Sequence, residues 1–353
     1  MSTVSILGAG VMGSAMVLPL RDRGHTVRLI GTHLDIDIID DVKAKGRHPK
    51  LNVTMPEGTT GYHHTELAAA MGGDCDLIVL GVSSAGIGWA IDRLCEVLSR
   101  PLDLVMITKG MFADGATLTA LPEHVARSVK SRTGFDLRIA AIGGPCIAGE
   151  LAVRRQTGTV IVSDHLDFTR QLCAMLETDY YHPRPSSDVI GVENCAAFKN
   201  FFAIAVGWAS GNLDKLAATE NRAYNHNAAA IIFNQAIREL MHLTLALGGT
   251  AESVWGMPGA GDLYVTCQAG RNSRLGSNLG RGLTYQQTRD GPMKGDTIEG
   301  AELGAAAAPA LRAMMASGTL QANAMPLTTA LLDALTGDTP LVIPWRSFHA
   351  ARG

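Results

Sequence analysis

The first half of the chain alternates short, mostly apolar runs with segments that repeat apolar residues at helical spacing. Runs without a regular polar face are typical of strands buried on both sides. Such strands, separated by amphipathic helices, predict a doubly wound α/β domain with a parallel sheet at its centre. The predicted strands are Val4–Leu7, Val27–Ile30, Leu77–Leu80, Leu104–Ile107, Leu137–Ile142 and Thr159–Val162.

The pattern changes after Tyr180–Asp188, a segment rich in proline and polar residues. Beyond it, strand-like runs almost disappear and long Ala-rich helical patterns follow, near Glu193–Ser210, Ala223–Leu247 and Ala301–Ser317. We place the boundary near Ile190. The sequence therefore predicts two domains, an α/β domain over residues 1–190 and an all-α domain over residues 191–353.

Composition excludes several classes of function. The 353 residues, 46% hydrophobic and 18% charged, have an ordinary globular composition, and their length suggests about two domains. The net charge is −3 and like charges form no block, so nothing favours a nucleic acid or a membrane surface as partner. The apolar stretch Cys195–Ala209 is interrupted by Lys199 and Asn200, and is shorter than the ~20 residues that cross a bilayer.

The cysteines and the N-terminus indicate a cellular location. The 6 cysteines are scattered, without C-x-x-C pairs or a zinc-like spacing, which favours a reducing compartment and no structural metal. The first strand is predicted to begin at about Val4, which leaves no room for a signal segment. We therefore expect a cytoplasmic protein.

A glycine motif lies between the first predicted strand and the first helix. Gly8, Gly10 and Gly13 form G-x-G-x-x-G directly after Val4–Leu7. In a strand–turn–helix context, these glycines permit a tight turn, close approach of a pyrophosphate, and packing of the helix on the sheet. The motif predicts a Rossmann-type dinucleotide site, the alternative being a glycine-rich turn without a ligand.

The end of the second strand leaves the choice of dinucleotide open. Enzymes selective for NAD usually have an acidic residue there, whereas this chain has Gly31, Thr32 and His33. Thr32 and His33 could bind a 2′-phosphate, and Asp35 could still reach a ribose. Both NAD and NADP are therefore expected cofactors, and His33 could equally be a solvated loop residue.

Two lysines are candidates for the chemistry. Lys109 follows a buried strand, at the edge where doubly wound sheets bind ligands. Lys199 lies in a helix whose neighbouring positions are apolar, so burial is expected to lower its pKa and suit it to proton transfer. The alternative for Lys199 is a side chain whose ammonium extends to water.

A third segment combines a carboxylate with several donors. Asp262 lies among small residues and could orient a lysine, while Thr266, Arg271 and Asn272 could hold a doubly charged anion. This combination indicates a phosphate site. Taken alone, the same residues could be a helix N-cap and a surface arginine.

Together these segments resemble, in order, the glycerol-3-phosphate dehydrogenases that use nicotinamide cofactors, over most of the chain from Gly8 to about Gly300. Cys146-Ile147 stands where that family commonly has Ser-Phe, so a weaker thiol donor replaces a hydroxyl. The matching stretches are Gly8–Ala15, Thr108–Gly110, Gly144–Glu150, Phe198–Asn200, Gly261–Leu263, Thr266–Cys267, Gly270–Asn272 and Ile298–Gly300.

The resemblance implies a set of site residues. Lys199 would be the catalytic proton donor and acceptor, assisted by Lys109 and Asp262. The implied substrate-binding residues are Lys109, Gly144, Cys146, Asn200, Thr266, Gly270, Arg271 and Asn272. The implied cofactor-binding residues are Gly8, Gly10, Val11, Met12, Gly13, Thr32, Lys109, Ala148, Arg271 and Glu299.

The resemblance also implies the reaction, the interconversion of sn-glycerol 3-phosphate and dihydroxyacetone phosphate with NAD or NADP. The expected partner is a small phosphorylated polyol, and family habit suggests a homodimer. Alternatives are a dehydrogenase of another polyol phosphate, a β-hydroxyacid or ketopantoate-type reductase, and, more remotely, a non-catalytic dinucleotide sensor. A buried lysine argues against the sensor, because binding alone does not need one.

Overall fold

The computed structural model describes residues 1–213 and 223–348. Within them the chain forms two compact units, which are described separately. The first unit comprises Met1–Lys109 and Ala120–Val189, and the second comprises Gly110–Thr119 together with the chain from Ile190 onward.

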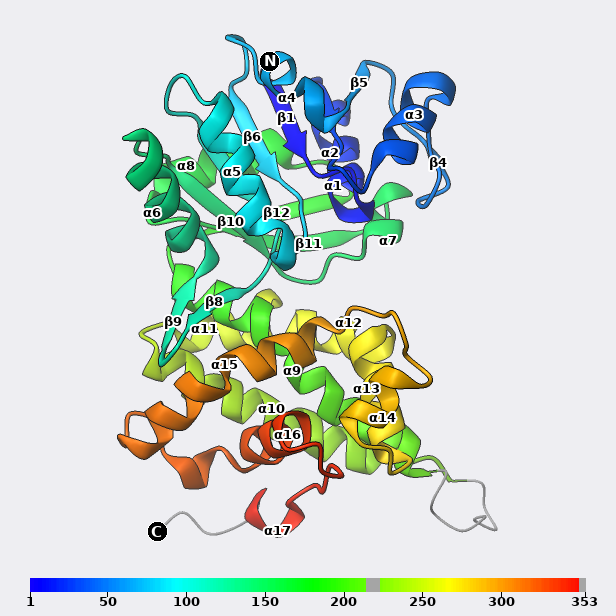
Figure 1. Cartoon of the computed structure of the whole chain (residues 1–353), viewed down its shortest axis with the longest axis vertical. Helices are drawn as coiled ribbons and strands as arrows, with labels where there is room; N and C mark the ends of the chain where they lie inside the picture. The colour runs from blue at the N-terminus through cyan, green and yellow to red at the C-terminus, as the bar shows by residue number, and fades with distance from the viewer. Residues whose placement is uncertain (214–222, 349–353) are drawn as a thin grey trace. The chain divides into compact units, whose positions relative to one another are not determined.

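An eight-stranded sheet forms the centre of the first unit (Figure 1). Strands β5, β2 and β1 lie on one side of the point where the strand order reverses, and β6, β7 and β10 lie on the other. In doubly wound sheets, ligands bind at the carboxyl ends of the strands beside such a point. From edge to edge the strands are β12 (Tyr181–Ser186), β11 (Thr157–Val162), β10 (Ile139–Gly143), β7 (Asp103–Met106), β6 (Leu77–Leu80), β1 (Thr3–Leu7), β2 (Thr26–Ile30) and β5 (Thr59–Tyr62).

Strands β11 and β12 depart from the predicted all-parallel sheet. β11 pairs antiparallel with β10, and β12 then runs parallel to β11. The Tyr180–Asp188 segment contains edge strand β12, where the sequence suggested only a connection. Pro183 and Pro185 are two residues apart, so both missing N–H groups can face the free edge without breaking the ladder to β11.

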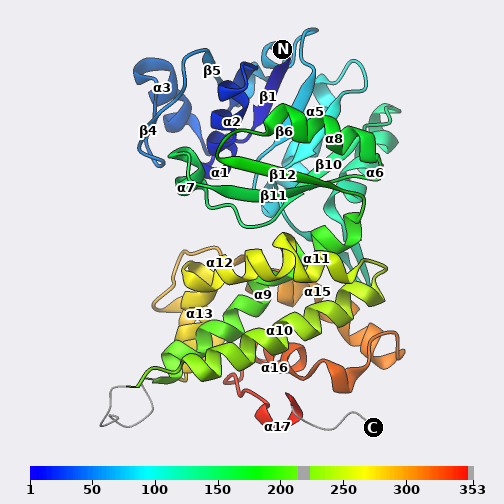
Figure 2. The ribbon, with the colours of Figure 1, turned by 180° about the vertical axis from the view of Figure 1, so that it is seen from behind.

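Helices cover both faces of the sheet. α5 (Ile87–Val97) and α6 (Leu121–Thr133) lie in front of it in Figure 1, and α8 (Leu166–Leu176) lies in front of the opposite face in Figure 2. Each presents an apolar side to the sheet, which confirms the predicted doubly wound architecture. The unit also contains α1 (Val11–Ala15), α2 (Val17–Asp22), α3 (Ile36–Lys45), α4 (Leu67–Ala70), α7 (Ala148–Ala152) and the short hairpin β3 (Arg47–His48)–β4 (Val53–Thr54).

A second hairpin, β8 (Met111–Asp114)–β9 (Thr117–Ala120), leaves the first unit directly after Lys109. Residues Gly110–Thr119 group with the second unit, where β8 contacts α15 (Glu299–Ala316). A single domain boundary near Ile190 does not predict that this hairpin groups with the second unit. The local sequence of a short hairpin does not indicate which unit it packs against.

The second unit is built around one buried helix, α9 (Val189–Leu213). Figures 1 and 2 show α15 and α10 (His226–Ala246) on opposite sides of it. The predicted helical character of this part is thus confirmed. The other helices described in this unit are α11 (Ala251–Trp255), the π-helical turn Met257–Gly261, α12 (Asp262–Gln268), α13 (Arg271–Gly280), α14 (Tyr285–Asp290), the 3-10 helix Ala322–Ala324, α16 (Pro326–Thr336) and α17 (Trp345–Phe348).

Among the described residues, α9 alone has the length and composition of a membrane span, with a mean hydropathy of 1.4. However, 78% of that apolar window is buried inside the structure. Asn194 on α9 donates to Thr244 on α10, and Phe201 packs against Gly304 on α15. The surrounding helices therefore account for its apolar surface.

Glycines bring α9 and α13 into backbone contact. Gly207 and Gly211 on α9 face Ser273 and Ser277 on α13, while Gly276 and Gly280 on α13 face the backbone of α9. A Cβ atom at any of the four glycines would overlap a backbone atom of the other helix. Glycine at these positions thus sets the distance between the two helices.

Candidate active site

The glycine motif forms the turn between β1 and α1. Gly8 has φ +116°, a backbone conformation that side chains disfavour, and a Cβ there would lie 2.6 Å from the carbonyl carbon of Gly81. A Cβ on Gly13 would overlap the Gly8 carbonyl oxygen. At Gly10, by contrast, it would meet no atom within 4 Å. The loop is therefore closed toward the protein and open at its middle glycine, which fits the diphosphate of a dinucleotide.

A carboxylate is hydrogen-bonded to the loop that follows β2. Asp35 accepts hydrogen bonds from the Thr32 N–H (2.9 Å) and the Thr32 hydroxyl (2.8 Å). The ring of His33 lies 5.6 Å from that of Trp89 and 6.5 Å from that of His64. Thr32, the Asp35 carboxylate and a cluster of rings in edge-on and tilted contact therefore lie beyond the end of β2. Such a surface is suited to the adenosine part of a dinucleotide.

Lys109 lies beyond the carboxyl end of β7, as the sequence predicted. Its Nζ donates to the Gly144 carbonyl at 2.8 Å, which brings together the ends of β7 and β10. Cys146 follows on the same connection, and Ala148 begins α7. Three of the substrate-site candidates, Lys109, Gly144 and Cys146, therefore lie at the carboxyl edge of the sheet.

Lys199 forms a buried ion pair in the second unit. Its ammonium donates to the carboxylate of Asp262, and the two side chains are only 10% and 2% exposed. A lysine whose ammonium extends to water is thereby excluded. Asp262, the first residue of α12, is likewise no surface N-cap but the partner of the lysine. The pair places an amine and a carboxylate in contact inside the helical unit, away from water.

The π-helical turn before Asp262 depends on a close backbone approach. A Cβ at Gly259 would lie 2.6 Å from the Cα of Val254, and nearer still to its carbonyl oxygen. Because the obstacle is backbone, a side chain at this position must displace the turn that carries Asp262.

We expect Gly259→Ala to shift the Lys199–Asp262 contact. Because the family resemblance implies that this pair is catalytic, turnover should fall by about tenfold. The measurement is steady-state kinetics together with a crystal structure of the variant. Gly249→Ala, which meets the backbone of Gly191 instead, is the matched control. A Gly259→Ala enzyme with wild-type turnover and an altered turn would contradict the expectation.

The N-terminus of α13 carries the predicted anion-binding residues. Gly270 precedes the helix with φ +118° and provides no side-chain cap for the first N–H groups. Arg271 is paired with Glu299, and the Oδ1 atom of Asn272 accepts from the Gly300 N–H at 2.9 Å. Uncapped N–H groups beside an arginine favour a phosphate.

Further contacts connect α13 to the lysine. A Cβ at Gly300 would lie 2.5 Å from the carbonyl carbon of Asn200 and 2.8 Å from Asn272 Oδ1, so these three residues adjoin. On α12, the Thr266 hydroxyl donates to the Asp262 carbonyl at 2.7 Å. The second unit therefore brings Lys199, Asn200, Asp262, Thr266 and Asn272 into one continuous region.

Cys267 lies within reach of the Lys199 charge. Burial raises the pKa of its thiol to about 12, and the nearby ammonium only partly offsets this effect. The thiol is therefore neutral at physiological pH.

His48 is a buried residue that the sequence did not indicate. It lies at the end of β3, in the β3–β4 hairpin. Its ring contacts the glycine motif. No periodicity or spacing could have found it, because the contact joins residues 39 positions apart.

We expect the first unit to lose thermal stability as the pH falls from 7.5 toward 5. Burial lowers the pKa of His25, His48 and His124 below the ordinary value of 6.5. Well above pH 6.5 these histidines are neutral in both the folded and the unfolded state. As the pH falls through 6.5, the unfolded chain binds protons before the folded protein does. The free energy of unfolding therefore decreases until the pH has passed the folded-state pKa values. Calorimetry across this range measures the effect.

The control is a variant in which the three histidines are replaced by glutamine, whose midpoint should depend less on pH in this window. A wild-type midpoint that stays constant between pH 7.5 and 5.5 would show that these three histidines are not linked to folding.

Comparison with known proteins gives concordant matches over both units. The family model described as the NAD-dependent glycerol-3-phosphate dehydrogenase N-terminus matches residues 3–169, and the model of the corresponding C-terminus matches residues 188–342. The NADP(+)-dependent glycerol-3-phosphate dehydrogenase of Archaeoglobus fulgidus is 33% identical over 287 residues, 81% of this chain and 82% of that protein. The glycerol-3-phosphate dehydrogenase [NAD(P)+] of Halorhodospira halophila is 28% identical over an alignment that covers 96% of this chain and 94% of that protein.

A solved structure agrees with these matches. The crystal structure of the Coxiella burnetii glycerol-3-phosphate dehydrogenase superposes with a TM-score of 0.77 at 27% identity, covering 98% of this chain and 97% of that one.

Proposed function

The chain belongs to the family of NAD-dependent glycerol-3-phosphate dehydrogenases, and from that membership we propose that Lys199 moves the proton in the reaction. The enzyme interconverts sn-glycerol 3-phosphate and dihydroxyacetone phosphate with NAD or NADP. The bound nicotinamide supplies hydride acceptance and donation. The protein must supply a proton carrier, a means of holding the phosphate, and a cradle for the cofactor.

The observation that carries the proposal is the buried pairing of Lys199 with Asp262. In the oxidation direction, neutral Lys199 accepts the hydroxyl proton; in reduction, its ammonium returns that proton to the carbonyl oxygen. Asp262 orients the amine and stabilises its charged form. Lys109 is assigned the stabilisation of charge on the reacting oxygen, on the basis of the family resemblance.

We assign the substrate phosphate to the N-terminus of α13. The first N–H groups of this helix have no side-chain cap, and Arg271 adds a guanidinium beside them. Thr266, Asn200, Asn272 and Gly270 are assigned to the same substrate. Phosphate binding is remote from the reacting carbon, so its energy can support turnover as well as affinity.

We expect a substrate without phosphate to lose both turnover and affinity. Dihydroxyacetone should be reduced at least ~100-fold more slowly than dihydroxyacetone phosphate under saturating conditions. The measurement is NADH and NADPH consumption with dihydroxyacetone phosphate, dihydroxyacetone, ketopantoate and erythrulose phosphate side by side. A preference for ketopantoate would overturn the substrate assignment, and the same assay ranks the two coenzymes.

Arg271→Leu separates the phosphate assignment from the lysine assignment. This variant should weaken use of dihydroxyacetone phosphate much more than the slow reaction of dihydroxyacetone, because the guanidinium is assigned to the substrate phosphate. Equal losses with both substrates would instead place Arg271 at the cofactor.

We further propose a cytoplasmic homodimer. The cytoplasmic location rests on the scattered pattern of the cysteines in the sequence, which favours a reducing compartment. The dimer rests on family habit. Light scattering after size-exclusion chromatography at micromolar concentration tests it, and a monomer mass would reject it.

A further inference from the structure

His48 is held between two backbone groups in the interior of the first unit. It is fully buried; its Nε2 lies 3.0 Å from the carbonyl oxygen of Ala9, and its Nδ1 accepts from the N–H of Leu51 at 3.0 Å. Because Nδ1 is the acceptor, Nε2 carries the hydrogen and donates to Ala9. One ring thus joins the β3–β4 hairpin to the middle of the glycine motif.

The Ala9 carbonyl receives a second donor. The hydroxyl of Ser14, also fully buried, donates to the same oxygen at 3.1 Å. Two buried donors therefore fix the direction in which the carbonyl between Gly8 and Gly10 points.

Fixing this carbonyl also fixes the next N–H. In a planar trans peptide the C=O of Ala9 and the N–H of Gly10 point in opposite directions. Because the Ala9 carbonyl points toward the buried donors, the Gly10 N–H points away from the protein interior. Gly10 is also the position of the motif at which an added Cβ would meet no atom.

We propose that His48 is a positioning residue of the cofactor site, which together with Ser14 holds the Ala9–Gly10 peptide so that its N–H serves the cofactor diphosphate. The ligand chemistry is a dinucleotide diphosphate, and the effect of His48 is transmitted through backbone. A peptide left unrestrained would have to be ordered when the cofactor binds, which reduces affinity.

The competing role for His48 is to close the β3–β4 hairpin through Leu51 alone. Two amide substitutions separate the roles, because a glutamine amide reaches the position of Nε2 and an asparagine amide reaches that of Nδ1. His48→Gln keeps the donor to Ala9 and loses the acceptor for Leu51. His48→Asn keeps the acceptor and loses the donor.

Dissociation constants of NADH and NADPH, measured from nicotinamide fluorescence in the full chain, test the proposal. His48→Asn should bind the dinucleotides about tenfold more weakly, the usual effect of one buried hydrogen bond, and His48→Gln should bind nearly as wild type. ADP-ribose, which carries the diphosphate without nicotinamide, should follow the same order by calorimetry. The reverse order, or equal affinities for the two variants, would overturn the proposal.

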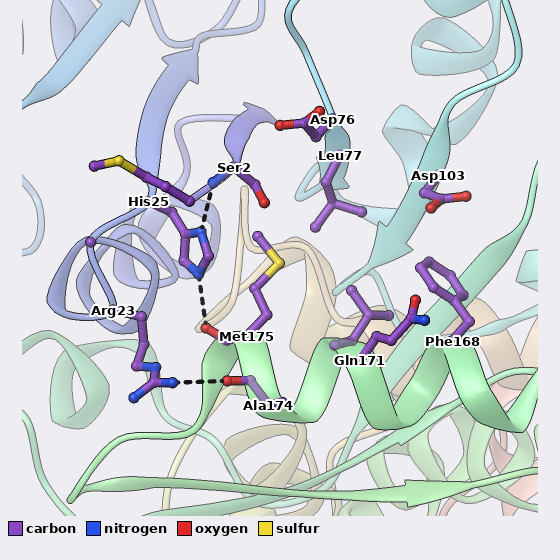
Figure 3. A pocket seen from close by; sticks show the side chains of 13 residues that line it. Ser2, Arg23, His25, Asp76, Leu77, Asp103, Phe168, Gln171, Ala174 and Met175 are labelled. Atoms are coloured by element: carbon purple, nitrogen blue, oxygen red, sulfur yellow. Dashed lines mark hydrogen bonds between the residues drawn. The ribbon is translucent and has the colours of Figure 1, made fainter.

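His25 provides a matched control in the same unit. Its Nδ1 accepts from the Ser2 N–H and its Nε2 contacts the Met175 carbonyl, each at 3.2 Å, so it also joins two backbone groups (Figure 3). It precedes β2, at the amino ends of the strands and thus at the opposite edge of the sheet from the glycine motif. His25→Asn should lower the unfolding temperature and leave the dinucleotide affinity unchanged.

Ser14→Ala provides a second measurement if His48→Asn folds poorly. It removes the other donor to Ala9 and should weaken dinucleotide binding on its own. In the double variant the two losses should not add, because both act on one carbonyl. Full additivity, or wild-type affinity in Ser14→Ala, would show that the carbonyl is not the common point of action.

Discussion

Replacing Lys199 by methionine should lower turnover by a factor of ~100 or more, because the reaction loses its proton donor and acceptor. Methionine keeps the length and apolar body of the side chain but can neither carry nor release a proton. Stopped-flow hydride transfer in both directions measures the effect. The dissociation constant of the dinucleotide should remain close to that of the wild type.

A complication is that the variant leaves Asp262 as a buried carboxylate without its lysine, which destabilises a protein by about 3–5 kcal/mol. The double variant Lys199→Met with Asp262→Asn removes both charges and controls for this cost. It should recover much of the stability and none of the turnover. Near wild-type turnover in either variant would refute the role of Lys199.

Gly276→Ala should destabilise the second unit by about 3 kcal/mol or more, at the upper end of the usual cost of overpacking. The added methyl would overlap the Ile204 carbonyl oxygen and lie 2.9 Å from the Trp208 nitrogen, both on α9. Neither is a flexible side chain that can move aside. The helices α9 and α13 must separate, and α13 carries Arg271 and Asn272 at its start.

Thermal unfolding of the full chain tests this expectation, together with the KM for dihydroxyacetone phosphate, which should rise. Gly88→Ala in α5 is the control, because a Cβ there meets no atom within 4 Å, and it should be neutral or slightly stabilising. An unchanged unfolding temperature for Gly276→Ala would mean that the α9–α13 contact is looser than the structure has it.

Several features of the fold were predictable because their causes are local. The positive φ of Gly8 is required by the tight turn in which it lies. A Cβ at Gly13 would overlap the carbonyl oxygen of a residue only five positions earlier in the chain. The helical character of α9, α10 and α15 follows from long runs of helix-forming residues. The apolar neighbours of Lys199 likewise predicted its burial.

Other features could not be predicted from local pattern. The prolines of β12 argued against a strand, and only its place at the edge of the sheet makes them harmless. Nothing in residues 157–162 shows that β11 runs antiparallel to β10. Residues 110–119 group with the second unit, although the first unit both precedes and follows them in the sequence.

The sequence by itself determined the two-part architecture, the dinucleotide turn and the residue types available for chemistry. Tertiary structure alone decided which of them meet: Asp262 approaches Lys199 across 63 residues, and His48 approaches Ala9 across 39. Periodicity and turn chemistry act over a few neighbouring residues, so the chain displays them directly. Pairing of buried polar groups depends on which surfaces exclude water together, and that is settled only when distant segments pack.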